Sequence, residues 1–192
     1  MRRAAFWLWA SLAIALVNLL GPGGPITALA DQRDNRLDGL FERLQTTSDP
    51  GDAATLQHRI WQIWIESGDP ASSQLMRRGM TAMANGDHDN ALDAFNTLVE
   101  QAPDFAEAWN KRATVYYLLG RLDESVNDIQ HTLELEPRHF GALSGLALIY
   151  DAVEQPEAAI RSLEAALEIN PHLQGSEDRI NQLREKMKGT RT

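Results

Sequence analysis

Histidine and carboxylate side chains are the groups in this chain that could do chemistry. The 192 residues include 27 acidic residues, 18 basic residues and five histidines (His58, His88, His131, His139 and His172), but no cysteine. The lack of cysteine excludes disulfides, thiolate metal sites, cysteine nucleophiles and lipid attachment through an N-terminal cysteine. A metal site in this chain would therefore rest on histidines and carboxylates.

The spacing of these side chains does not match a known catalytic or metal-binding pattern. His139 and His172 each follow a proline closely in corresponding segments, but no carboxylates stand at ligand spacing beside them. Asp87-His88-Asp89 lacks the central glycine and distal glutamate of a calcium loop, and an aspartate there is better suited to cap a helix. A glycine-rich phosphate loop, a G-x-S-x-G elbow and an H-E-x-x-H motif are also missing. We expect no catalytic residue, no metal and no cofactor, and therefore a protein that is not an enzyme.

The N-terminal segment has the order of a secretory signal. Met1-Arg2-Arg3 precedes an apolar run over 4–20, the glycines and prolines of 21–25 break any helix, and Ala28-Leu29-Ala30 is an A-x-A site. This order predicts a signal peptide over residues 1–30 and a periplasmic protein that has no membrane contact after cleavage. An uncleaved anchor is the alternative, because the apolar run reaches the lower edge of spanning length.

The charge of the chain is strongly negative. The formal net charge is −9, and it becomes −11 without residues 1–30, which contain two arginines and no acidic residue. Such a surface repels phosphate, so we expect no nucleic-acid partner.

Three prolines mark an internal repeat. Pro103, Pro137 and Pro171 stand 34 residues apart, and the segments that end at them can be aligned without gaps. A fixed period of this length is typical of a helical solenoid, in which each unit buries its apolar face against its neighbours.

The aligned segments share large and small residues at fixed positions, and these residues identify a family. The fourth position holds Leu75, Trp109 and Leu143; the eighth Gly79, Ala113 and Ala147; the eleventh Ala82, Tyr116 and Tyr150; the twentieth Ala91, Ser125 and Ala159; the twenty-fourth Phe95, Ile129 and Leu163; the twenty-seventh Leu98, Thr132 and Ala166. Residues 72–171 thus resemble the tetratricopeptide repeat (TPR) family, although Ala82 and Leu98 depart from its pattern. Gly86 and Gly120, in the turns within the repeats, suit helix ends with positive φ, and Glu154 takes this place in the third repeat.

The resemblance implies an all-α, right-handed TPR helical solenoid. Upstream, an apolar helical stripe from Leu37 to Leu44 and a second one from Leu56 to Ile65 predict a degenerate TPR-like helical pair that caps the stack. Downstream, Ile180, Leu183 and Met187 predict a C-terminal capping helix. The expected divisions are a signal peptide (1–30), the degenerate pair (31–70), three repeats (71–104, 105–138 and 139–173) and the capping helix with its tail (174–192).

In TPR arrays the first helix of each repeat lines a concave groove. Carried over to this chain, the groove positions include Met76, Met80, Met83, Asn110, Lys111, Thr114, Tyr117, Ser144 and Leu148. Flexible methionines adapt to apolar partners, whereas a tyrosine and an asparagine offer a hydroxyl and an amide that can pair with a peptide backbone. The alternative for the methionine stripe is that it packs on the upstream helical pair and belongs to the core.

One specialisation of the family does not fit this sequence. Chaperone-binding TPRs hold a C-terminal carboxylate with basic residues and asparagine at positions occupied here by Met76, Met80, Gly141 and Gly145. The predicted function is therefore a non-catalytic periplasmic adaptor that holds a peptide or helix of an envelope protein in its groove. The alternative is a self-associating structural scaffold at or near the inner membrane. Trp61 and Trp64 would favour this homo-oligomer if their rings were exposed.

Overall fold

The computed structural model describes residues 31–66 and 69–189, and every regular element in these ranges is an α-helix. The signal peptide predicted for residues 1–30 lies outside the described residues. The helices are α1 (Arg36–Thr46), α2 (Pro50–Ile65), α3 (Pro70–Ala84), α4 (His88–Gln101), α5 (Ala106–Leu118), α6 (Leu122–Leu135), α7 (Phe140–Ala152), α8 (Pro156–Ile169) and α9 (Ser176–Gly189). The all-α solenoid is confirmed. Within these ranges no helix is both long enough and apolar enough to cross a membrane.

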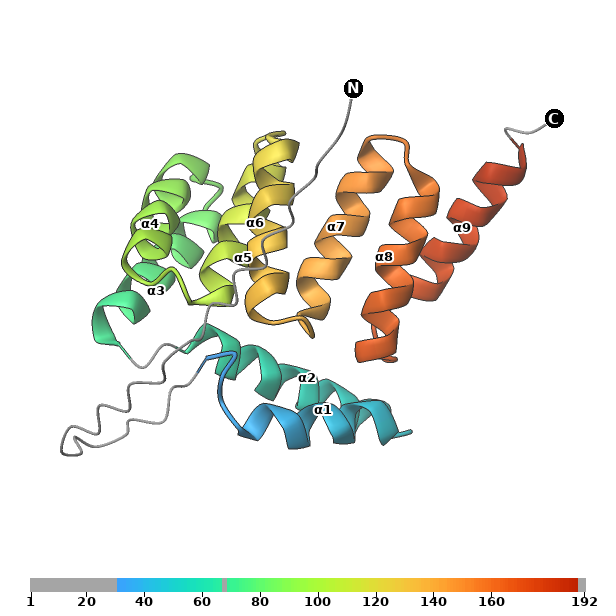
Figure 1. Ribbon diagram of the computed structural model, residues 1–192, viewed down its shortest axis with the longest axis horizontal. Helices are drawn as coiled ribbons and strands as arrows, with labels where there is room; N and C mark the ends of the chain where they lie inside the picture. Colours follow the sequence, from blue (N-terminus) through green and yellow to red (C-terminus); the bar gives the residue numbers. More distant parts are fainter. Residues whose placement is uncertain (1–30, 67–68, 190–192) are drawn as a thin grey trace, which may run out of the picture.

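Helices α3 to α8 form three consecutive pairs that stand side by side (Figure 1). The turn in each of the first two pairs ends with a glycine in the left-handed region, since Gly86 and Gly120 both have φ of 72°. Glu154 adopts the same conformation in the third pair, with φ of 57°. Left-handed backbone suits glycine best, so the third turn is the least favourable of the three.

Small and large residues meet between the paired helices, as the repeat pattern predicts. Phe95 lies directly against Gly79, where an added Cβ would come within 2.5 Å of the ring. Gly79 therefore lets α3 and α4 approach closely around the aromatic ring. Buried Phe95, Leu98 and Val99 form the core of this first pair together with Met76.

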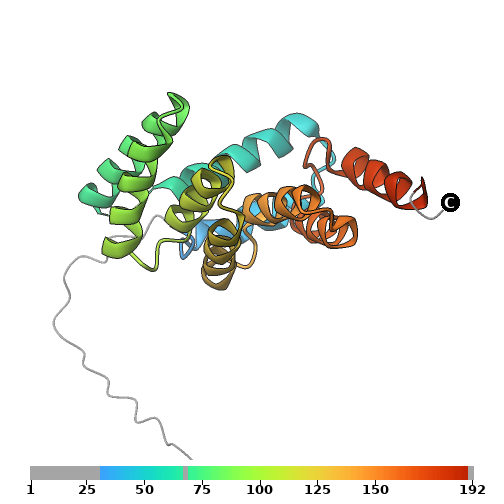
Figure 2. The same cartoon turned by 90° about the horizontal axis from the view of Figure 1, so that it is seen from above.

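The N-terminal pair occupies a different place from the one we predicted. Instead of stacking in front of α3, helices α1 and α2 run crosswise beneath the edge of the upright helices, from the α3 side toward α8 (Figures 1 and 2). Their core cluster contains Trp64 and Phe41, but it also takes in Phe140 of α7 and Ala166 of α8. We call α1 and α2 together the brace, because they connect repeats that are distant in sequence.

Polar contacts fix the brace, and the short segment that precedes it, to the repeats. The side chain of Gln32 accepts a hydrogen bond from the backbone N–H of Ala106 at 3.2 Å and so caps α5. Arg138 forms an ion pair with Asp38 at 2.7 Å, and Gln45 donates to the Glu168 carbonyl at 3.2 Å. These contacts reach the start of the second repeat, the loop that follows its second helix, and the end of α8 in the third repeat.

The other end of the stack closes as predicted. Ile180 and Leu183 of α9 are buried against Ile160 and Leu163 of α8. The exposed side of α9 is rich in charge, which suits a terminal helix that faces solvent.

Candidate functional site

A groove lies between α5 and α7, on the side of the repeats that the first helices line. Its volume is about 230 Å³. The lining residues are Asn110, Ala113, Thr114 and Tyr117 of α5, Ser125 and Ile129 of α6, and Gly141, Ser144, Gly145 and Leu148 of α7. Small residues make up much of this lining, so the backbone of α7 is accessible there. Leu148 remains 53% exposed beside the groove.

The structure gathers some of the predicted groove residues here and places the others elsewhere. Asn110, Thr114, Tyr117, Ser144 and Leu148 all line this groove.

Met76 is not a groove residue, because it is fully buried in the core of the first repeat. Met80 and Met83 are partly buried and pack against the same core, as does Ile65 of the brace. The prediction that the methionine stripe forms a binding wall is therefore wrong for Met76, and the core alternative is correct there. The physical reason is that Met76 packs among Phe95, Leu98 and Val99 of α4, and Ile65 at the end of α2 packs against the same cluster.

The polar groups of the groove wall are already bonded within the protein. The hydroxyl of Thr114 donates to the Asn110 carbonyl at 2.9 Å, and that of Ser144 donates to the Phe140 carbonyl at 2.8 Å. Ser125 donates to the Ala113 carbonyl at 2.8 Å. These walls therefore present carbon atoms to a ligand, and the groove is more apolar than its residue names suggest.

The amide nitrogen of Asn110, which we predicted to pair with a peptide backbone, already has a partner inside the protein. Its side chain is buried, and its amide donates to Oε2 of Glu107 at 2.9 Å. Lys111 is occupied as well, since its ammonium group forms an ion pair with Glu107 Oε1 at 2.9 Å and lies over the Trp61 ring at 5.2 Å. Both residues belong to a buried cluster at one end of the groove.

Glu107 and His139 form the centre of that cluster, and neither side chain is exposed to solvent. His139 Nδ1 accepts a hydrogen bond from the backbone N–H of Ala142 at 3.0 Å, so it carries no proton. The proton therefore resides on Nε2, which donates to Glu107 Oε2 at 2.8 Å. His139 thus caps α7 and holds the Glu107 carboxylate of α5 at the same time.

The surroundings of Glu107 keep it ionised. Burial alone raises the pKa of a carboxyl group, but the charge of Lys111 and the hydrogen bond from His139 outweigh this effect and lower the pKa of Glu107 to about 2. Glu107 is therefore a structural anion at neutral pH, unlike a general acid, whose pKa must be raised toward the working pH.

Two tryptophans of α2 cover the cluster. The Trp64 ring stacks on His139 with a centroid distance of 4.1 Å and an interplanar angle of 10°. Trp61 contacts His139 edge-on and lies so close to Gly141 that a Cβ there would come within 2.6 Å of the indole. The brace thus fills one end of the concave surface and leaves the end near Tyr117 open. Trp64 is buried, and Trp61 is partly buried against His139 and Phe140, so these two rings do not form the large exposed patch that would favour self-association.

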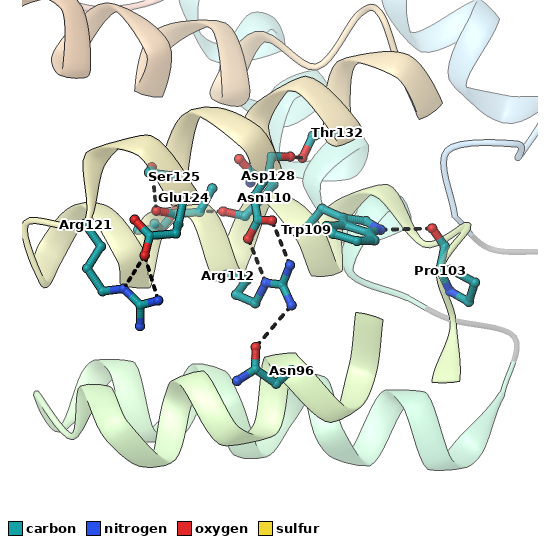
Figure 3. A network of polar contacts seen from close by, with 12 residues as sticks. Asn96, Pro103, Trp109, Asn110, Arg112, Arg121, Glu124, Ser125, Asp128 and Thr132 are labelled. Carbon is teal, nitrogen blue, oxygen red and sulfur yellow. Dashed lines mark hydrogen bonds and ion pairs between the residues drawn. The ribbon is translucent and has the colours of Figure 1, made fainter. Parts of the chain in front are cut away.

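A second polar network joins the first two repeats (Figure 3). Arg112 of α5 binds both carboxylate oxygens of Asp128 on α6, each at 2.7 Å, and it donates to Asn96 of α4 at 3.1 Å. Its guanidinium group also lies 4.8 Å from the centre of the Trp109 ring. Arg112 is thus held in the interior as a connector between repeats, because its donors are already satisfied there.

The described residues contain no group of three or more histidine, cysteine or acidic side chains placed to hold a metal ion. In addition, both ring nitrogens of His139 are hydrogen-bonded inside the protein, so neither is free to bind a metal ion.

Comparison with known proteins places this fold and repeat pattern in a family. Two family profiles, both described as tetratricopeptide repeat, match residues 76–130 and 104–171. A TPR repeat-containing protein of Rhizobium etli is 36% identical over 157 residues, which are 82% of this chain and 77% of that protein. The chain belongs to the tetratricopeptide repeat family.

Solved TPR structures share its fold. The first TPR domain of Spaghetti (RPAP3) bound to the HSP90 peptide SRMEEVD is 19% identical, with a TM-score of 0.59 over 61% of this chain and 93% of that one. The TPR2B domain of yeast Sti1 in a complex with pHsp70 is 24% identical, with a TM-score of 0.56 over 64% and 99% of the two chains. At these identities the likeness concerns the fold alone.

Proposed function

We propose that this TPR protein is a non-catalytic interaction module, which receives an apolar segment of an envelope protein in the groove between α5 and α7. One observation carries the proposal. The wall hydroxyls of Thr114, Ser125 and Ser144 are bonded to the protein's own backbone, while Leu148 projects an exposed apolar side chain beside them. Such a surface gains most from burying carbon atoms.

The shape of the groove sets the kind of segment that fits. The small lining residues, Gly145 and Ala113 among them, let a helix or an extended chain approach the protein closely. A volume of about 230 Å³ suits a few side chains, while Tyr117 supplies apolar area and a hydroxyl at the open end. The partner is therefore a segment with two or three adjacent apolar residues.

The HSP90 and Hsp70 complexes of the solved neighbours support peptide binding as a use of this fold. The residues that would grip a terminal carboxylate are replaced here by Met76, Met80, Gly141 and Gly145. We therefore propose an internal apolar segment as the ligand in place of a charged C-terminus. The signal-like order of residues 1–30 supports the periplasm as the compartment.

Crosslinking in the cells of origin tests the proposal. A photoreactive residue at position 117 is expected to capture one discrete envelope protein, whereas the same residue at Glu134, which is exposed on α6, captures none. The captured protein is then titrated against variants. Tyr117→Ala and Leu148→Glu are each expected to weaken its binding at least tenfold, and Val153→Glu, at an exposed site outside the groove, leaves the affinity unchanged.

Two results would contradict the proposal. Equal capture at positions 117 and 134 would mean that the groove has no special role. Crosslinks between copies of this chain alone would favour the structural scaffold. Met80→Glu is unsuitable as a test, because Met80 packs against the core of the first repeat and a glutamate there would destabilise the fold.

A further inference from the structure

The turns within the second and third repeats carry exposed apolar side chains. Leu118 is 50% exposed, Leu119 38% and Val153 43%. Leu148 is similarly exposed, but it lines the groove between α5 and α7. A single exposed leucine is ordinary on a protein surface, whereas several at one place mark an interaction site. We call Leu118, Leu119 and Val153 together the turn edge.

The turn edge lies away from the brace. The turns within the repeats stand at one end of the upright helices, and the brace crosses the opposite end (Figure 1). Leu118 is the last residue of α5 and Leu119 follows it, while Val153 directly follows α7. Because α5 and α7 contact each other, these apolar side chains belong to neighbouring helix ends.

The charges around the turn edge are mainly negative. Five carboxylates and two guanidinium groups flank it, those of Asp123, Glu124, Asp151, Glu154 and Glu157 and those of Arg121 and Arg179. Both guanidinium groups are ion-paired to carboxylates of this set, Arg121 to Glu124 and Arg179 to Asp151. The local balance is therefore three negative charges.

The other three carboxylates are free. Asp123, Glu154 and Glu157 are exposed, and their side chains form no ion pair or hydrogen bond with any residue in the described part of the chain. They are therefore available to a basic partner.

Glu154 has a backbone conformation that favours glycine. Its φ is 57°, and the matching residues of the other two repeats are Gly86 and Gly120. Glycine at this position would relieve the strain of a left-handed residue with a side chain. The third turn thus keeps a carboxylate where the fold alone would favour glycine, which indicates a role outside folding.

We propose that the turn edge docks a basic amphipathic helix of a partner protein. The apolar stripe of that helix would cover the turn edge, and its flanking lysines or arginines would pair with the three free carboxylates. Packed helices lie about 8–10 Å apart, and seven residues of a helix rise about 10 Å, so leucines at i, i+3 and i+7 reach both turns. This surface is separate from the groove between α5 and α7 and does not depend on the function proposed for that groove.

The negative charge also argues against two other occupants. Free carboxylates repel the headgroups of anionic lipids, and a second copy of this chain has the same net charge of −9. Complementary charge at a rim orients a basic helix and excludes acidic ones.

A synthetic helical peptide provides the test. The probe is a stapled, fluorescein-labelled peptide with a leucine stripe between two rows of lysines. One control has glutamate in place of every lysine, and a second has serine in place of every leucine. Fluorescence anisotropy with the full chain is expected to show at least tenfold tighter binding of the probe than of either control. The Leu118→Ser/Val153→Ser double variant should bind the probe at least tenfold more weakly, with unchanged circular dichroism.

Glu154→Gly distinguishes docking from a structural role. Because it relieves the left-handed strain, this variant is expected to unfold at a slightly higher temperature than the wild type, yet to bind the probe at least threefold more weakly. Glu42→Gln removes an exposed carboxylate from α1, in the brace, and should leave the affinity unchanged. Leu148→Glu, in the groove between α5 and α7, should also bind the probe normally, because an added carboxylate does not repel lysines.

Several results would overturn the proposal. Equal affinity for the probe and either control peptide would do so, as would unchanged binding in the Leu118→Ser/Val153→Ser double variant. Loss of binding in Leu148→Glu would place the peptide in the groove instead. Self-association of the full chain that the double variant abolishes would assign the turn edge to a second copy, and co-sedimentation with phosphatidylglycerol vesicles that it abolishes would assign the turn edge to a membrane surface.

Discussion

Glu107 is an ionised carboxylate without access to solvent, and its partners come from two different parts of the chain. Lys111 lies one turn further along α5, and His139 lies at the start of α7. A buried charge is tolerated only when such partners are in place, because it would otherwise lose its hydration without compensation. The stability of this junction therefore depends on the ionisation of one residue.

The low pKa of Glu107 predicts a pH dependence of stability. A carboxyl group whose pKa falls from its usual 4.5 to about 2 on folding stabilises the folded state above about pH 4.5, and this contribution is lost as the pH falls toward 2. The size of the shift corresponds to about 3 kcal/mol at neutral pH. Glu107→Gln is therefore expected to lower the free energy of unfolding at pH 7 by about 3 kcal/mol, and to make it less dependent on pH between 4.5 and 2.5. Urea unfolding over this pH range measures both effects.

Glu134→Gln is the matched control, because Glu134 is exposed on α6. It should change the free energy of unfolding by less than about 0.5 kcal/mol at any of these pH values. Parallel pH profiles for the wild type and Glu107→Gln would contradict the assignment of Glu107 as the buried anion.

Part of this cluster could be anticipated from the sequence. Glu107 and Lys111 have the i, i+4 spacing of a helical ion pair. The burial of this cluster could not be anticipated. The side chains that cover it, Trp61 and Trp64, belong to a helical pair that we expected in front of the first repeat. His139 gave no local signal either, since its role as the cap of α7 depends on the orientation of its ring.

At the scale of the element, the first repeat differs from the others by a compensating pair of residues. The eighth position is Gly79 in the first repeat and Ala113 and Ala147 in the next two. The opposing twenty-fourth position is Phe95 in the first repeat and the smaller Ile129 and Leu163 in the others. The first helical pair therefore combines a larger ring with a smaller opposing residue and keeps close packing between its helices.

This compensation predicts that Gly79→Ala destabilises the protein although alanine favours helices. The new Cβ would lie 2.5 Å from Phe95, and relief of this clash is expected to cost about 1–3 kcal/mol. In a Phe95→Leu background the ring is absent, so Gly79→Ala should instead stabilise by about 0.5–1 kcal/mol through helix propensity. Urea unfolding of the four proteins in this cycle measures the difference.

Gly39→Ala separates the gain in helix propensity from the clash with Phe95. Gly39 is also inside a helix, but no atom lies within 4 Å of its added Cβ. This variant should be more stable than the wild type by about 0.5–1 kcal/mol. If Gly79→Ala were stabilising in the wild type as well, the close approach of α3 and α4 would not be a constraint.

The repeat helices and their turns are the part of the fold that the sequence predicts best. The periodic residues are local to each unit, so their interpretation does not depend on distant contacts. The same locality explains the error at Met76. The repeat register places it on the concave surface, but the register does not tell which other helix covers that surface.

At the scale of the whole molecule, the brace changes the character of the solenoid. Repeat arrays normally contact only their neighbours in sequence. Here Gln45 contacts Glu168 across 123 residues, and Arg138 contacts Asp38 across 100. The brace is thereby fixed to the third repeat. It restricts changes in the angles between repeats.

The junction of Trp61 with Gly141 predicts a strong coupling between the brace and the third repeat. Gly141→Ala alone would place a Cβ 2.6 Å from the Trp61 indole, so it is expected to destabilise by about 2 kcal/mol. In a Trp61→Ala background the same change should be neutral or slightly stabilising, which gives a coupling energy of about 2 kcal/mol.

Chemical denaturation of the wild type, the two single variants and the double variant measures this coupling. Gly145→Ala is the control on the same helix, because its Cβ would meet Ile129 at an ordinary 3.6 Å. Additive effects of Gly141→Ala and Trp61→Ala would mean that the brace does not pack on α7 in solution.

The crosswise position of α1 and α2 also bears on how the chain becomes folded. Synthesis runs from the N-terminus, so Trp64 is made long before Phe140 and Ala166, which complete its hydrophobic core. An ordinary array could fold one unit after another as it emerges, but here α2 packs mainly against α1 until the third repeat is made, and the rest of its aromatic side stays uncovered. The first helices therefore complete their core only when the third repeat is present, and premature termination within that repeat would leave an exposed aromatic surface prone to aggregation.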